Sequence, residues 1–254
     1  MESLVRSIPL LQRVARRIEK AKRRNIKDSI VSHPHLIDPT AVVTGAHLIG
    51  PVRIGEYAHI KRDTLLRGNI SIGRYTAING PHTDILCEID SVQIGAFCSV
   101  ARNVAIQEYN HRAAGCSTCF VLSRVLGHEE ACEIETKGPI LIGNDVWIGT
   151  QCVILSGSTI GDGAVIAANS VVTSAIPPYA IAAGSPARVL RYRFSDTIIE
   201  RLLKLEWWRW PRERLEQNRA LFEGDLTGDK LDSVEESSPQ QLAFESGDQF
   251  GGRF

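Results

Sequence analysis

The chain has 254 residues, of which 43% are hydrophobic and 23% charged, a balance typical of a soluble globular protein with one or two domains. Its net charge is zero, yet residues 1–27 hold nine basic residues against two acidic ones, and residues 223–254 hold eight acidic residues against two basic ones. The opening segment has no apolar run long enough for a signal peptide or a membrane span. From these features we expect a cytoplasmic protein.

Residues 1–30 are predicted to form a basic amphipathic helix, because Leu11, Val14, Ile18 and Ala21 follow Pro9 at helical spacing among many arginines and lysines. Such a helix can pack on its own subunit or a neighbouring one. Alternatively, residues 9–24 can make weak contact with an anionic membrane surface. No aromatic or groove-reading motif accompanies the charge, so nucleic-acid binding is not expected.

Residues 31–190 carry an aliphatic residue at every sixth position over long stretches, which is neither a helical nor a simple strand period. A period of six predicts an all-β solenoid, in which each hexad forms one flat side and its aliphatic residue points into a continuous core. The first run is Leu36, Val42, Leu48, Ile54, Ile60, Leu66, Ile72 and Ile78. The later runs are Ile94, Val100 and Ile106, then Ile142, Ile148, Ile154, Ile160, Ile166 and Val172. The later runs are offset from the first by four positions, so residues 79–93 are expected to contain an excursion.

Residues 110–139 lack the hexad pattern, so we expect them to form a loop extruded from the solenoid. The loop holds Cys116, Cys119, His128 and Cys132, and one alternative for this set is a zinc site. Cys98 and Cys152 instead occupy small positions of hexads, where buried packing residues are expected. Six cysteines without a secretory signal indicate reduced thiols.

After the solenoid, residues 191–224 are predicted to form C-terminal helices. Ser195 and Asp196 can begin the first of these helices. Three tryptophans, Trp207, Trp208 and Trp210, are interpreted as a packing anchor rather than a ligand-binding box. Residues 225–254 are acidic and rich in serine, glycine and glutamine, and they are expected to be a disordered tail.

Several motifs carry a resemblance to a known family. They are Tyr-Asn-His-Arg at 109–112, Ile-Gly-Asn-Asp-Val-Trp-Ile-Gly at 142–149, Ala-Gly-Ser-Pro-Ala-Arg at 183–188, and Trp-Trp-Arg-Trp-Pro at 207–211. Together with the hexads, these motifs resemble the hexapeptide-repeat acetyltransferases, in particular the xenobiotic branch that includes type B chloramphenicol and streptogramin acetyltransferases. The resemblance implies a left-handed parallel β-helix, a homotrimer, and acetyl-CoA as acetyl donor without a metal.

The chemistry requires a general base, because an alcohol at neutral pH is a poor nucleophile toward a thioester. His111 lies where the hexads give way to the loop, and it matches the family's catalytic histidine. Asn110 and Arg112 beside it are the expected substrate-binding residues. Either Glu108 or a backbone carbonyl could orient the imidazole, and we expect direct transfer rather than a covalent route through Cys116 or Cys119.

The resemblance also implies where the donor binds. Thr150, Ala168, Thr173 and Ser174 match positions that contact coenzyme A in related sugar acetyltransferases, although small corner residues would be equally natural at Thr150 and Ala168. Arg188 and Arg191 match basic positions that follow the last coil, where guanidinium groups can pair with phosphates.

The motifs say less about the acetyl acceptor than about the donor. Drug-modifying members continue the Asn-His-Arg motif with Met-Asp-Gly-Ser-Thr-Tyr-Pro-Phe, whereas residues 113–120 here read Ala-Ala-Gly-Cys-Ser-Thr-Cys-Phe. The expected function is therefore O-acetylation of a hydroxyl on a surface polysaccharide or its precursor. An antibiotic acetyltransferase is the alternative, and a solenoid scaffold without catalytic activity is a third.

Overall fold

The computed structural model describes residues 25–129 and 132–236. The chain divides into two compact units, and the division falls between Arg193 and Phe194. Most of the predicted N-terminal helix, residues 1–24, lies outside the described residues. The expectation of helix is wrong for the end of that segment, because β1 (Ile26–Lys27) and β2 (Ile30–Val31) already pair with the solenoid.

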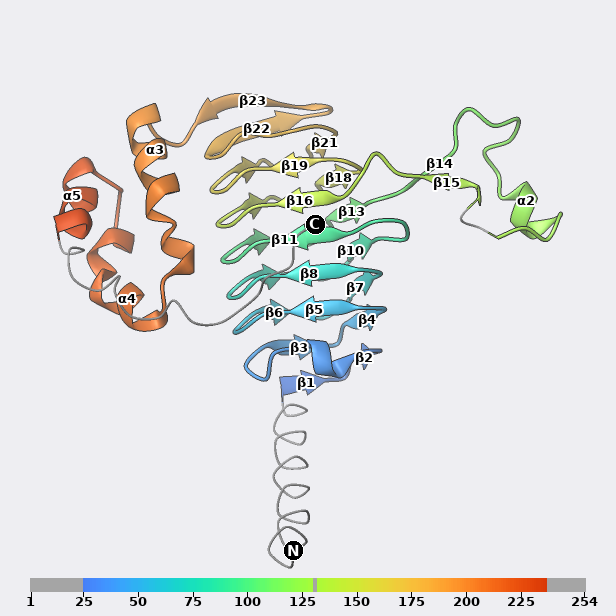
Figure 1. Ribbon diagram of the computed structural model, residues 1–254, viewed down its shortest axis with the longest axis horizontal. Helices are drawn as coiled ribbons and strands as arrows, with labels where there is room; N and C mark the ends of the chain where they lie inside the picture. Colours follow the sequence, from blue (N-terminus) through green and yellow to red (C-terminus); the bar gives the residue numbers. More distant parts are fainter. Residues whose placement is uncertain (1–24, 130–131, 237–254) are drawn as a thin grey trace, which may run out of the picture. The chain divides into compact units, whose positions relative to one another are not determined.

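The first unit is a parallel β-solenoid whose coils contribute in turn to three sheets (Figure 1). The nine-stranded sheet contains β1, β3 (Val42–Thr44), β6 (His59–Ile60), β9 (Ala77–Ile78), β12 (Ser99–Val100), β17 (Trp147–Ile148), β20 (Val165–Ile166), β22 (Ala180–Gly184) and β23 (Ala187–Tyr192). The seven-stranded sheet contains β2, β4 (His47–Ile49), β7 (Thr64–Arg67), β10 (Thr83–Leu86), β13 (Ala105–Gln107), β18 (Val153–Leu155) and β21 (Val171–Val172). The five-stranded sheet contains β5 (Val52–Ile54), β8 (Ile70–Ile72), β11 (Val92–Ile94), β16 (Ile140–Ile142) and β19 (Thr159–Ile160). A short 3-10 helix, η2 (Pro34–Leu36), precedes β3.

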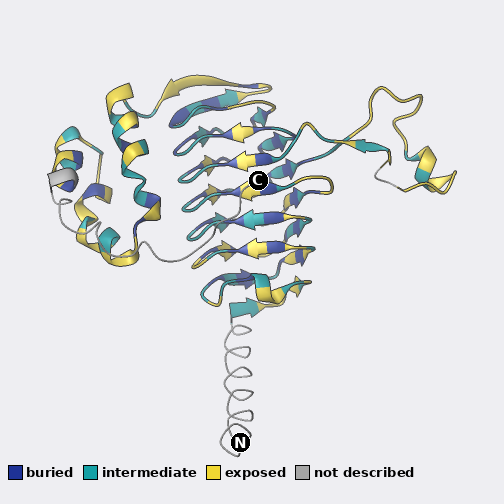
Figure 2. Ribbon diagram, in the orientation of Figure 1, coloured by how far each residue is buried: buried dark blue, intermediate teal, exposed yellow. Residues whose placement is uncertain are grey.

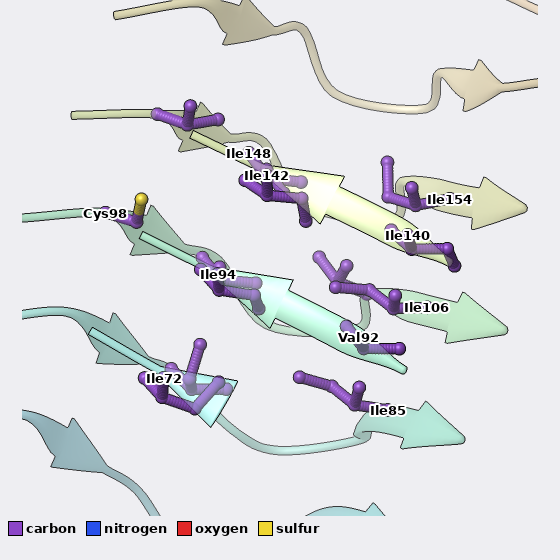
Figure 3. Close-up of a cluster of buried hydrophobic side chains, with 14 of the residues drawn as sticks. Ile72, Ile85, Val92, Ile94, Cys98, Ile106, Ile140, Ile142, Ile148 and Ile154 are labelled. Carbon is purple, nitrogen blue, oxygen red and sulfur yellow. The ribbon is translucent and has the colours of Figure 1, made fainter. Parts of the chain in front are cut away.

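The hexad residues form the core because the parallel pairing places the same hexad position of each coil above that of the last. Leu66 pairs with Leu48, and Ile72 with Ile54, in each case eighteen residues apart, which is three hexads. The hexad side chains are largely buried (Figure 2), and they stack in columns along the inside of the coil, such as the column of Ile72, Ile94 and Ile142 (Figure 3). Coils packed this closely leave no room at some corners, since a Cβ at Gly95 would lie 2.5 Å from the Gly143 carbonyl oxygen.

One expectation about register is corrected. In the first coil Ile37 and Val43 are buried, whereas Leu36 and Val42 are not, so the first two hexads are shifted by one residue. A tight turn at Gly45, where φ is +59°, shortens the step from Val43 to Leu48. The sequence period alone cannot reveal this shift, because Leu36-Ile37 and Val42-Val43 offer two aliphatic residues each.

The excursion predicted within residues 79–93 is confirmed, and it is divided between two turns. Ile85 pairs with Leu66, nineteen residues back, while Ile94 pairs with Ile72, twenty-two residues back. One extra residue therefore lies before β10, and three more lie between β10 and β11. Both turns close without leaving the solenoid.

A single large insertion leaves the solenoid after β13 and returns at β16 (Figure 1). Ile142 pairs with Ile94, forty-eight residues back, which is thirty more than a regular coil. The loop begins as a two-stranded antiparallel ribbon of β14 (Asn110–His111) and β15 (Ile134–Glu135) and also carries a short helix, α2 (Val121–Arg124). Its two ends lie on neighbouring rungs at one corner, so residues distant in sequence meet there.

Three cysteines are packing residues of the coil. Cys87, Cys98 and Cys152 are buried, which confirms the prediction made for Cys98 and Cys152. The thiols of Cys98 and Cys152 donate to corner carbonyls of the next coil, from Cys98 to Gly143 at 3.0 Å and from Cys152 to Ala167 at 3.1 Å. Burial raises the pKa of Cys98 to about 12 and also raises the pKa of Cys152.

The second unit consists of short helices: α3 (Asp196–Leu205), η4 (Trp207–Arg209), α4 (Arg212–Gln217), η5 (Arg219–Phe222) and α5 (Gly228–Glu236). Trp208 and Trp210 are buried, and the Arg214 guanidinium stacks 4.2 Å from the Trp210 ring centroid. Helix α5 corrects the expectation of disorder from residue 225 onward, since its Leu231 and Val234 are buried. None of the helices in the described ranges is long and apolar enough to cross a membrane.

Candidate active site

His111 lies on β14 at the base of the loop, with its ring held by two contacts. Nδ1 is 2.8 Å from the Thr118 carbonyl oxygen, and the Phe120 ring packs edge-on at 4.7 Å between centroids. A carbonyl oxygen can only accept, so Nδ1 carries the proton and donates it. In the neutral imidazole Nε2 then has a free lone pair, which is the state that a general base requires.

His111 opens onto a cavity of about 240 Å³ between the loop and the solenoid. The loop contributes Asn110, His111, Glu135 and Lys137, and the solenoid contributes Leu155, Ser156 and Thr173. The cavity thus combines an imidazole, a carboxylate, an ammonium group and an amide, and Leu155 gives it a short apolar wall. This composition suits a small polar molecule that presents hydroxyl groups.

Buried Ser156 anchors the returning end of the loop. Its Oγ accepts a 2.6 Å hydrogen bond from the Lys137 amide and lies 3.0 Å from Thr136 Oγ1. Thr136 Oγ1 also donates to the Glu108 carbonyl at 2.9 Å, which ties the two ends of the loop together. The sequence analysis did not select Ser156, Glu135 or Lys137. The available signal was their position in the chain, near the point where the hexads begin again at Ile142.

Glu108 does not orient the imidazole. Its carboxylate is fully buried, and Oε2 accepts from the backbone amides of Glu88 at 3.2 Å and Ile89 at 3.0 Å. Of the two orienting groups considered, the backbone carbonyl is therefore the one found, and it belongs to Thr118. Glu108 instead closes the enlarged turn before β11, and its charge adds to the effect of burial in raising the pKa of Cys87 to about 11.

The other predicted site residues fall into separate groups. Thr173 lines the cavity with His111, and exposed Ser174 follows it. Thr150 and Ala168 lie at the other end of the strands, just before β18 and β21 begin. At this corner the Asn169 amide of one coil donates to the Thr150 carbonyl of the coil before it at 3.0 Å. Strand β21 separates the two groups.

Arg188 and Arg191 both lie on β23, which pairs Arg188 with Ala183 and Arg191 with Ile181. Both side chains are exposed, and each has a local contact to a backbone carbonyl, from Arg188 to Ala187 at 2.9 Å and from Arg191 to Tyr192 at 3.4 Å. In the described part of the chain neither guanidinium pairs with a carboxylate. Both are therefore available to an anionic ligand.

Arg112 does not line the His111 cavity. It lines a second cavity of about 380 Å³ within the loop, and its Nη1 donates to the Cys132 carbonyl at 3.2 Å. This loop cavity is also lined by Cys116, Cys119 and Cys132. The zinc alternative finds no support, since within residues 25–129 and 132–236 no three histidine, cysteine or acidic side chains are grouped to hold a metal.

Comparison with known proteins identifies the family of the chain. Residues 139–174 match the family described as bacterial transferase hexapeptide (six repeats). The chain is 44% identical to a probable macrolide acetyltransferase of Lysinibacillus sphaericus over 56% of this chain and 82% of that one. The chain belongs to the hexapeptide-repeat acetyltransferases. It is also 36% identical to a chloramphenicol acetyltransferase of Morganella morganii, over 61% of this chain and 82% of the relative.

The fold of this hexapeptide-repeat acetyltransferase is shared more widely. A variant of AntD, an N-acyltransferase from Bacillus cereus, superposes with a TM-score of 0.53 at 19% identity, covering 74% of this chain and 95% of that one. The matched repeats at 139–174 contain the solenoid's share of the cavity, including Ser156 and Thr173. The loop that supplies His111 lies outside those repeats.

Proposed function

We propose that this acetyltransferase moves an acetyl group from acetyl-CoA to a hydroxyl of a saccharide, with His111 as general base. The observation that carries the proposal is the 2.8 Å contact between His111 Nδ1 and the Thr118 carbonyl, which leaves Nε2 as an acceptor at a polar cavity. Nε2 takes the hydroxyl proton as the oxygen attacks the thioester carbonyl. When the tetrahedral intermediate collapses, the imidazolium returns that proton to the departing thiolate.

For the donor, we propose that coenzyme A extends across the seven-stranded sheet. Its thioester would lie by Thr173 and Ser174 at the His111 cavity, and its far end would reach the corner with Thr150 and Ala168. The exposed guanidinium groups of Arg188 and Arg191 would pair with its phosphates, because charge-assisted hydrogen bonds to phosphate are the strong ones.

For the acceptor, the cavity lining favours a polyhydroxylated molecule. Asn110 and Lys137 offer donors and Glu135 offers an acceptor, and the loop departs from the drug-modifying pattern after Arg112. Release of coenzyme A thiol in the presence of acetyl-CoA and a panel of mono- and oligosaccharides tests this. Turnover with saccharides supports the proposal, and turnover confined to antibiotics rejects the acceptor.

An antibiotic hydroxyl is the second candidate acceptor. The relatives named macrolide and chloramphenicol acetyltransferases, at 44% and 36% identity, favour it. The same panel should therefore contain a macrolide and chloramphenicol, so that one experiment decides between the two acceptors.

We also propose that the enzyme works as a homotrimer with its sites between subunits. The 240 Å³ cavity of a single chain is small, His111 is exposed, and a groove between two solenoid faces would supply the enclosure that one face lacks. Sedimentation should show a trimer, and a fully active monomer would exclude this arrangement.

A further inference from the structure

The loop segment 115–122 has two faces that serve different surroundings. On one face, the Thr118 carbonyl accepts from His111 Nδ1 and the Phe120 ring contacts the imidazole. On the other face, Cys116 and Cys119 line the loop cavity of about 380 Å³. The group that holds the imidazole thus lies between two cysteines of a C-x-x-C sequence.

The loop thiols differ from those of the solenoid in access to solvent. Cys116 and Cys119 are exposed and unbridged, whereas Cys87, Cys98 and Cys152 are buried in the coil. Oxidation of cysteine requires access of the oxidant to sulfur, and a nearby second thiol can then form a disulfide. Oxidation is therefore expected at the cysteines of the loop rather than at those of the solenoid.

We propose that Cys116 and Cys119 form a reversible disulfide that disengages His111 from Thr118, a regulation that rests on the proposed function of His111. With a peroxide as oxidant, one thiolate attacks the peroxide oxygen and becomes a sulfenic acid, and the peroxide is reduced to water. The second thiol attacks that sulfur, the S–S bond forms, and the sulfenic oxygen leaves as a second water. A dithiol reverses the reaction by exchange.

Coupling to His111 follows from the position of Thr118 within the ring that this disulfide would close. A disulfide fixes its two Cβ atoms about 3.8 Å apart, so closure constrains the backbone between Cys116 and Cys119, which includes the Thr118 carbonyl. In the proposed disulfide form, this constrained ring holds the Thr118 carbonyl away from His111 Nδ1. Without that acceptor, Nδ1 is no longer held as the donor, and the imidazole loses both its tautomer and its orientation.

The test compares the reduced protein with protein treated with hydrogen peroxide. Peptide mapping should find Cys116 linked to Cys119, and acetyl transfer should fall by about 10- to 100-fold, the usual cost of a misplaced catalytic group. Dithiothreitol should restore the rate. The Cys119→Ser variant should keep its activity under peroxide, whereas Cys132→Ser should lose activity as the native protein does.

A readout independent of acetyl transfer is the ¹⁵N NMR signal of the His111 imidazole, assigned with His111→Asn. It should report Nδ1–H in the reduced protein and a mixture of tautomers after oxidation. If the reduced protein transfers no acetyl group at all, the proposed function fails, while the mapping and the imidazole signal still decide this proposal. Absence of a Cys116–Cys119 bond, or an imidazole signal that the bond leaves unchanged, overturns it.

Discussion

Replacing His111 tests whether it is the base or only a neighbour of the acceptor. His111→Asn keeps a side-chain N–H donor close to where Nδ1 now donates to the Thr118 carbonyl at 2.8 Å, so the loop retains its hydrogen bond. The variant has no basic nitrogen in place of Nε2. Turnover should therefore fall by about 10²–10⁴-fold, the usual contribution of a general base, which corresponds to about 2.7–5.4 kcal/mol of barrier at 1.36 kcal/mol per tenfold change.

The structure shows which groups could replace His111 as base in these variants. The other titratable groups lining the His111 cavity are Glu135 and Lys137. A carboxylate is a weaker base than imidazole, so substitution by Glu135 would be incomplete. His111→Ala, which removes the hydrogen bond as well, should be no faster than His111→Asn.

Initial rates of acetyl-CoA consumption and calorimetric binding of acetyl-CoA should be measured for both variants. We expect lower turnover with nearly unchanged donor affinity. His128→Asn is the matched control, since His128 is an exposed histidine of the same loop that does not line the cavity. A near-native rate for His111→Asn at neutral pH would refute the assignment of His111 as base.

Three further predictions concern the donor site, the thiols and the loop. Arg188→Ala and Arg191→Ala should each raise the dissociation constant of acetyl-CoA about ten- to a hundred-fold, because a hydrogen bond to a charged group is worth about 1.5–3 kcal/mol; unchanged affinity in both, measured by calorimetry, removes them from the site. A thiol reagent should label three cysteines of the folded, reduced protein and all six after denaturation, since three are exposed and three buried; fast labelling of Cys98, whose pKa burial raises to about 12, would contradict the packing described. Desolvation raises the pKa of Glu133, but hydrogen bonds from Ser123 and the Leu122 amide outweigh this effect, so the pKa lies below its ordinary value. Its stabilising contribution is therefore present above the unfolded-state pKa and lost as pH falls through the folded one. Amide exchange should show Leu122 and Ser123 losing protection in acid, and Glu133→Ala, which removes both acceptor oxygens, should lack that protection at neutral pH; full protection in Glu133→Ala would show that the carboxylate does not hold α2.

Much of the fold could be predicted because a six-residue period specifies structure locally. Each hexad forms one side of a coil, so the direction of Ile148 or Ile154 follows from its place in the repeat without knowledge of distant residues. The thirty-residue interruption was visible for the same reason, and His111 could be selected by its motif at the start of that interruption. The left hand of the helix and the trimer come from the resemblance and stay predictions.

Only the tertiary structure decided which residues surround His111. Glu135 and Lys137 are more than twenty residues from it in sequence, and Ser156 and Thr173 are more than forty away, yet all five line one cavity. The sequence has no period across the loop, so nothing local indicates which side chains return to the corner. The loop leaves and rejoins the solenoid on neighbouring rungs, and this closure brings the groups together. Within the loop, the Thr118 carbonyl accepts from His111 Nδ1 and thereby selects the tautomer, and no residue pattern encodes this contact between a side chain and a backbone carbonyl.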